Sequence, residues 1–338
     1  MKNRILYLDV LRSFAMIMVL LLHSISDYIV RPELYGTVSW YANLCINAFA
    51  RTGVPIFFMV SGMLMLSSDN TKDIKKFYKK SLIRIGIPLL LWNVIYFIYK
   101  CTMGYIAFDI VLLFRCIINN GTEYHLWYLY TLTGIYLLAP FFKKIVDSCS
   151  TKEQIWLLFL MLLCTSIRPF VNQITQQYIY LFEPLFNGYI AFFFMGYILS
   201  NIKINRRILF SFSVIGLIGF VFSVVFHHIY SSRESIDLIF NYGYSLCHCA
   251  LAASVFVVIR YVFEKLTLFS GVASFLSKYS FGVYLVHVLI IDLVLKYLMI
   301  DASPIVSSMY IFAFAILLSL AVSFILGKVK YLKKAIGL

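Results

Sequence analysis

The chain has 338 residues, of which 62% are hydrophobic and 13% are charged. Its mean hydropathy of +0.88 excludes a water-soluble globular protein and predicts a polytopic helical membrane protein. The net charge of +14 does not indicate a nucleic-acid partner, because excess Lys and Arg in a membrane protein mark cytoplasmic loops. We predict an all-α bundle of transmembrane helices that forms a single domain over residues 1–338.

Apolar segments long enough to cross a bilayer, which takes roughly 20 residues, recur along the whole chain. The segment 106–119 is only moderately apolar and contains two charged residues, so we predict an interfacial or re-entrant helix there. We expect about ten spans, at residues 5–29, 39–67, 83–104, 124–146, 153–170, 181–201, 207–230, 236–263, 274–300 and 304–327.

The basic residues are distributed unequally between the two sides of this predicted bundle. Of the 29 Lys and Arg residues, 21 fall on the side that carries the N-terminus, 6 on the opposite side and 2 within spans. Because cytoplasmic loops are enriched in Lys and Arg, this bias predicts that both termini are cytoplasmic and that the number of spans is even. We expect membrane lipids around the protein and no nucleic-acid partner.

The first predicted span carries three ionisable residues, Asp9, Arg12 and His23. Asp or Arg at the centre of a membrane helix costs at least about 2.5–3.5 kcal/mol, so such residues face a protein interior or an aqueous cavity. Arg12 and His23 are eleven residues apart, which places them on one helix face about 16 Å apart along the axis. Two interpretations stay open. One is a functional site with a charged pair at one membrane depth and an imidazole at another; the other is a helix-end ion pair with a buried structural histidine.

The second predicted span contains Arg51, Pro55 and the pair Ser61-Gly62. Proline removes a backbone donor and clashes with the carbonyl four residues earlier, so we expect a kink. The small pair permits close approach of another helix or a ligand. Arg51 lies too deep for comfortable snorkelling, which favours a polar interior over a purely structural role.

A basic cluster precedes the third span and contains Lys75, Lys76, Lys79, Lys80 and Arg84. Such a cluster is typical of positive-inside loops that bind anionic lipid headgroups. The alternative is an anion site for the phosphates of a cytosolic cofactor.

The predicted outer boundary of the fourth span carries Glu123, His125 and Trp127. An aromatic belt accounts for the tryptophan but not for a carboxylate and an imidazole two residues apart. In the ninth span Ser280, Tyr284 and His287 share one helix face through their i, i+4, i+7 spacing.

The cysteines do not indicate a metal site or disulfides. Most of the seven fall inside apolar runs, where cysteine behaves as a small hydrophobic residue. Cys247, His248 and Cys249 point to different faces of a helix, so we predict no metal.

Five motifs in this order resemble the membrane-bound acyltransferase 3 family, whose members O-acylate surface glycans. The first is an Arg-x10-His pattern at Arg12 and His23, and the second is PIFFMVSG within the second span. The others are HLWYL at 125–129, FFMGY at 193–197 and YSFGVYLVH at 279–287. We expect a short, stand-alone member without the extra esterase-like domain that some members carry.

This resemblance implies an O-acyltransferase of the bacterial cytoplasmic membrane that uses acyl-CoA, with acetyl-CoA expected, as a co-substrate and has no permanently bound cofactor. It implies that His23 either is the general base, which we prefer, or briefly carries the acyl group, and that Arg12 and Asp9 support it. The implied acceptor is a glycan or a lipid-linked sugar. The implied acyl-CoA contacts are Lys79, Lys80, Arg84, Arg51 and Ser61. The implied acceptor contacts are Glu123, His125, Trp127, Tyr284 and His287.

One position departs from the family pattern. An Arg-x-x-Arg motif often precedes the third span, but here its first position is Ser81, with Lys80 adjacent and Arg84 at the second position. A competing hypothesis from another class is a non-enzymatic transporter or flippase of lipid-linked saccharide, which needs no acyl-CoA and no unique base.

Overall fold

The computed structural model of the chain describes residues 5–175, 188–234, 245–298 and 302–338, without the side chains of 167–170 and 173–174. The described segments contain helices and connecting loops and no β-strand, which confirms the all-α prediction. The beginnings of the predicted spans 181–201 and 236–263 and the end of 274–300 lie outside the described residues.

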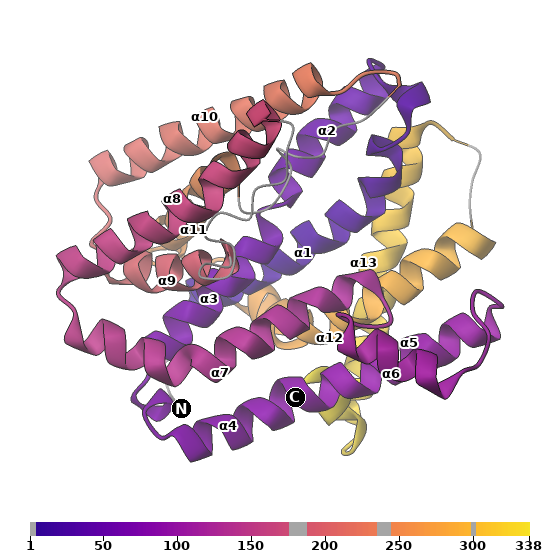
Figure 1. Cartoon of the computed structure of the whole chain (residues 1–338), viewed down its shortest axis with the longest axis horizontal. Helices are drawn as coiled ribbons and strands as arrows, with labels where there is room; N and C mark the ends of the chain where they lie inside the picture. Colours follow the sequence, from indigo (N-terminus) through magenta and orange to yellow (C-terminus); the bar gives the residue numbers. More distant parts are fainter. Residues whose placement is uncertain (1–4, 176–187, 235–244, 299–301) are drawn as a thin grey trace.

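The helices follow the predicted apolar segments closely (Figure 1). Their bounds are α1 (Leu6–Ile29), α2 (Val38–Ala50), α3 (Gly53–Leu66), α4 (Ile74–Ser81), α5 (Ile87–Thr102), α6 (Ile110–Ile118), α7 (Trp127–Ser148), α8 (Thr151–Thr175), α9 (Gly188–Asn201), α10 (Arg206–Tyr230), α11 (Leu246–Phe263), α12 (Ser270–Tyr297) and α13 (Pro304–Lys328).

Eight segments of the described chain are long and apolar enough to cross a membrane. The predicted fifth and sixth spans form α8 and α9, which are not among the eight, and α9 has only 14 residues. The number ten and the cytoplasmic termini therefore stay predictions. The segment 106–119 forms the nine-residue helix α6, which is too short to span a bilayer.

Helix α1 forms the centre of the bundle, where it packs against α2, α3, α11, α12 and α13. In Figure 1, α10 lies along one edge and α4 with α5 along the opposite edge, with α1 between them. Leu11, Ala15 and Leu20 of α1 are fully buried. The three functional candidates on this helix are therefore held in a packed element.

The second predicted span is interrupted between α2 and α3, at Arg51 and Thr52. Arg51 is the residue four positions before Pro55, where the proline ring would clash with a helical carbonyl. The amide of Thr52 bonds the carbonyl of Phe49 instead of continuing the α-helical pattern. This confirms the predicted kink and gives it a physical cause.

Helix α3 crosses α9 at very short range. A Cβ added to Gly62 would collide with the backbone carbonyl of Phe193, and one added to Gly196 would collide with that of Met59. The predicted close approach at Ser61-Gly62 is therefore confirmed, and it fixes the wall of the cavity described next.

Candidate functional site

A cavity of about 570 Å³ lies between α1, α3, α4, α7 and α12. No acidic side chain of the described chain lines it, so its electrostatic character is strongly positive. The cationic lining residues are Arg12, Lys76, Lys80, Arg84 and Lys278.

The cavity runs from an exposed mouth to a buried end. Lys80 and Arg84 at the mouth are exposed, whereas Tyr284 is only 3% exposed. Between them lie aromatic and aliphatic side chains, including Phe57 and Tyr128. This arrangement suits an elongated ligand with an anionic end and a less polar arm.

Arg84 belongs to a wide π-helical turn, Leu82–Gly86, that joins α4 to α5. Pro88 lacks the amide that would bond the carbonyl of Arg84, so a regular α-helix is interrupted at this point. Isolated π turns occur frequently at functional sites. Lys80 and Ser81 both line the cavity beside Arg84. Lys80, which adjoins the position where the family often has an arginine, therefore lies at the same mouth.

Tyr284 connects the cavity to a cluster of aromatic and imidazole rings. Its ring centroid lies 5.1 Å from that of Tyr128, 5.6 Å from that of His125 and 5.5 Å from that of His287. Its hydroxyl donates to the backbone carbonyl of His125. The buried end of the cavity is therefore in contact with two of the predicted histidines.

The third histidine completes this cluster, which we call the histidine cluster: His23, His125 and His287. The ring centroids of His23 and His287 are 5.1 Å apart, and those of His125 and His287 are 5.2 Å apart. The cluster thus joins α1, the turn before α7 and α12. His125 and His287 are buried, while His23 is partly exposed and accessible.

Backbone contacts determine the tautomer of His287. Its Nδ1 faces the carbonyl oxygen of Tyr284, so Nδ1 must carry a hydrogen and donate it. Its Nε2 is buried and has no hydrogen-bond partner among the described residues. A neutral His287 therefore presents an unused acceptor within the cluster.

Tyr96 of α5 supports the same region of α12. Its hydroxyl donates to the carbonyl of Leu285 at 2.9 Å and accepts from the amide of Leu289 at 3.3 Å. Its ring centroid lies 5.1 Å from that of His125. Helix α5 therefore fixes both α12 and His125.

Sequence reasoning placed many of these residues correctly on shared faces. Ser280 and Tyr284 line the cavity and His287 continues the same face into the histidine cluster. Arg12 lies in the cavity and His23 in the cluster, as their spacing on one face predicts.

Other predicted site residues lie apart from these two groups. Lys79 is not among the described residues that line the cavity, whereas its neighbours Lys76 and Lys80 are. Asp9 is buried in the first turn of α1, and its carbonyl accepts from the hydroxyl of Ser13.

The other residues predicted to contact acyl-CoA or the acceptor interact with side chains or the cavity as follows. The Nε of Arg51 donates to Asn47 at 2.8 Å, and the guanidinium is close enough to His23 for an electrostatic interaction. Glu123 pairs with Lys100 at 2.9 Å. The Trp127 ring lies 4.9 Å from the ring of Tyr189, and Ser61 lines the cavity.

Sequence reasoning did not identify Tyr96, Tyr124, Lys278 or Asp292 as site residues. Tyr124 adjoins the predicted His125, and Asp292 is an ionisable residue inside an apolar helix. The sequence alone could therefore have indicated both as site candidates. No set of three or more described His, Cys, Asp and Glu side chains has the geometry of a metal site.

Comparison with known proteins identifies the class to which this bundle and its cavity belong. The family model described as an acyltransferase domain matches residues 5–328, nearly the whole chain. The chain belongs to the acyltransferase 3 family, and it is a membrane acyltransferase.

Two curated relatives, both named amino-acid racemase and both from Enterococcus faecalis, share shorter segments. One is 32% identical over 137 residues, which cover 38% of this chain and 18% of the relative. The other is 37% identical over 84 residues, which cover 24% of this chain and 11% of the relative. The matches thus span less than a fifth of either relative. No solved structure matches the chain.

Proposed function

We propose that this membrane acyltransferase transfers a short acyl group, acetyl in the simplest case, from cytosolic acyl-CoA to a hydroxyl of a cell-surface glycan or its lipid-linked precursor. The bacterial cytoplasmic membrane is the proposed location. The observation that carries the proposal is one cavity that begins at exposed cations and ends at Tyr284, against the histidine cluster.

The cationic mouth is suited to the phosphates of CoA. Charge-assisted bonds from Arg and Lys to phosphate are stronger than neutral hydrogen bonds, and Lys80 and Arg84 are exposed and available for them. The pantetheine arm would then extend along the apolar wall past Arg12. The thioester would then lie beside Tyr284 and the histidine cluster.

In the proposed reaction His23 is the general base. Its ring accepts the proton of the acceptor hydroxyl while the acceptor oxygen attacks the thioester carbonyl carbon. The carbon–sulfur bond then breaks, and the departing CoA thiolate takes the proton from the imidazolium, which restores neutral His23. General-base catalysis of this kind contributes typically about 10²–10⁴-fold to the rate.

The acceptor is proposed to enter at the opposite end of the bundle. The unused Nε2 of His287 can accept a hydrogen bond from a sugar hydroxyl beside His23. Half-buried Asp292, which accepts from Tyr99 and Tyr105, adds polar groups at that end. We do not extend racemisation to this chain, because the matched segments cover only a small part of those relatives.

Radiolabelled acetyl-CoA supplied to membranes of expressing cells tests this proposal. We expect label in a glycan or lipid-linked fraction, equimolar release of CoA, and loss of both in His23→Ala. Transfer at the wild-type rate by a folded His23→Ala protein would contradict it, as would the absence of both products with folded wild-type protein.

A further inference from the structure

A contact between Tyr124 and His23 has no role in the mechanism described so far. The hydroxyl of Tyr124 lies 3.3 Å from Nδ1 of His23, and the two ring centroids are 5.2 Å apart. Tyr124 is 55% exposed, and its ring centroid also lies 5.9 Å from that of His125. The backbone bonds of the preceding residues add to these ring contacts.

The backbone before Tyr124 is clamped to α5. The amide of Thr122 donates to Oδ1 of Asn93 at 2.8 Å, and its hydroxyl donates to the Asn93 carbonyl at 2.9 Å. Asn93 is fully buried, so this clamp is shielded from water. Gly121 has a φ of 110°, and a Cβ there would lie 2.9 Å from Leu126, so the tight turn requires glycine.

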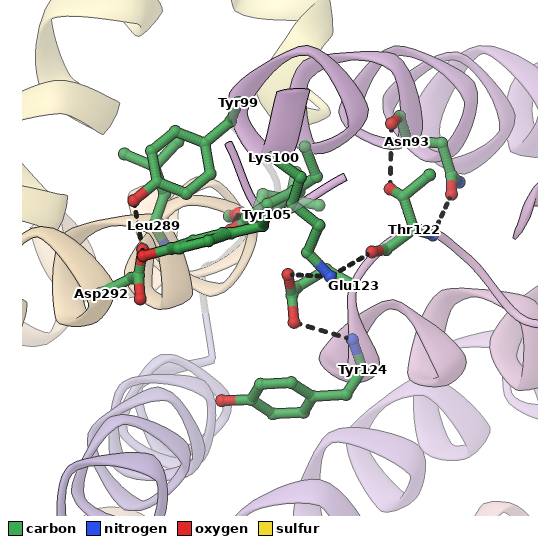
Figure 2. A network of polar contacts seen from close by, with 11 residues as sticks. Asn93, Tyr99, Lys100, Tyr105, Thr122, Glu123, Tyr124, Leu289 and Asp292 are labelled. Carbon is green, nitrogen blue, oxygen red and sulfur yellow. Dashed lines mark hydrogen bonds and ion pairs between the residues drawn. The ribbon is translucent and has the colours of Figure 1, made fainter. Parts of the chain in front are cut away.

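A second clamp holds the next residue. Lys100 donates to the carbonyl of Thr122 at 2.8 Å and pairs with Glu123 at 2.9 Å. The Glu123 carboxylate also accepts from the amide of Tyr124 at 3.2 Å. Figure 2 shows these bonds on one side of the segment, with the Tyr124 phenol extending away from them. Thr122 and Glu123 are thus held by α5, and Glu123 in turn holds the amide of Tyr124.

We propose that Tyr124 is a positioning residue that holds the His23 ring in the orientation needed for catalysis, and that the Asn93–Thr122 clamp holds Tyr124 in place. This inference rests on the proposed base role of His23. An imidazolium donates from both nitrogens, so Nδ1–H donates to the phenol oxygen while Nε2 carries the proton taken from the acceptor. Before transfer, the phenol can donate to Nδ1 or accept from Nδ1–H, and the second arrangement leaves the lone pair on Nε2 for the base.

Tyr124→Phe removes the hydroxyl and retains the ring. In the labelled acetyl-CoA assay we expect its kcat to fall about 10–100-fold, as for other groups that orient a functional histidine, with KM for acetyl-CoA unchanged. Tyr35→Phe is the matched control, because the Tyr35 hydroxyl also lies 3.3 Å from an imidazole Nδ1, that of His228 on α10. The control should retain wild-type kcat.

A pair of variants at Thr122 tests the clamp without touching Tyr124. Thr122→Val removes the hydroxyl bond to the Asn93 carbonyl and should lower kcat about 2–10-fold. Thr122→Ser keeps that bond and should retain the wild-type kcat. These variants also decide the matter if Tyr124→Phe does not fold.

The possible failures are distinguishable. Wild-type kcat in Tyr124→Phe, with His23→Ala inactive, would overturn the inference and leave the proposed function intact. A higher KM for acetyl-CoA with unchanged kcat would also overturn it. Full activity of His23→Ala would instead overturn the proposed function.

Discussion

The cavity and the histidine cluster meet at Tyr284 but are built in opposite ways. The cavity mouth consists of long, exposed cations from α4, α12 and the π turn. In the cluster the His287 ring donates to the carbonyl of Tyr284, and the Tyr284 hydroxyl in turn donates to the carbonyl of His125. One end therefore tolerates adjustment, and the other depends on fixed geometry.

This difference explains why a serine at position 81, where the family often has an arginine, is compatible with the proposed acyl-CoA site. A flexible lysine can reach a phosphate from a neighbouring position, although it lacks the planar, bidentate fork of arginine. No comparable adjustment is open to His287, which is buried and bonded to the backbone of its own helix. Substitutions should accordingly affect binding at one end and turnover at the other.

The largest effect should come from His23→Ala. Loss of the base is expected to lower kcat by about 10²–10⁴-fold. Binding of acetyl-CoA should persist, because His23 does not line the described cavity. Steady-state measurement of kcat and of KM for acetyl-CoA separates the two effects. A rise in KM without a fall in kcat would show that the His23 end binds acetyl-CoA and does not act in turnover.

Replacement of both Lys80 and Arg84 by alanine should produce the opposite pattern. We expect KM for acetyl-CoA to rise about tenfold or more, with a smaller effect on kcat, since two exposed charge-assisted contacts are lost. Lys144→Ala with Lys152→Ala removes the same charge away from the cavity and serves as control. Equal rises in KM for both double variants would indicate a general charge effect.

The close crossing of α3 and α9 offers a test of the cavity wall. Gly62→Ala forces a methyl group onto the Phe193 carbonyl and should destabilise the protein by about 1–3 kcal/mol. Gly134→Ala is the control, because an added Cβ there has no neighbour within 4 Å. Thermal unfolding in detergent compares the two, and a stable Gly62→Ala protein would show that the wall can relax.

The smallest effect concerns the loop 69–72 beside the cavity. A hydrogen bond and the charge of Lys72, 2.9 Å away, lower the pKa of Asp69 below its usual value of about 3.9. The stability from this depressed pKa is present above pH 4 and is lost as the pH falls through the pKa of folded Asp69. Asp69→Asn should slightly lower Tm at pH 7 and leave it unchanged below that pKa. An equal difference at both pH values would exclude the ion pair as its cause.

The sequence was sufficient to predict which residues lie together where their positions depend on helical periodicity. Arg12 and His23 share a face because of their spacing, and so do Ser280, Tyr284 and His287. The break at Arg51 follows from Pro55. These local rules predicted the helices and the two shared helix faces.

Contacts that depend on turns and distant segments were beyond local rules. Tyr124 reaches His23 only because Asn120 and Gly121 adopt positive φ and because Thr122 meets Asn93, 29 residues earlier. Residues 336–338 line the cavity although they are distant in sequence from its other walls. Periodicity carries no information on such pairings.

The most direct test is the thermal stability of detergent-purified protein with and without acetyl-CoA. We predict that wild type and His23→Ala are both stabilised, by about 2.7 kcal/mol at 100 times the wild-type dissociation constant. The Lys80/Arg84 double alanine variant, with about tenfold weaker binding, should gain only about 1.4 kcal/mol at the same concentration. Stabilisation that is lost in His23→Ala but retained in the double variant would contradict the division into a binding end and a catalytic end.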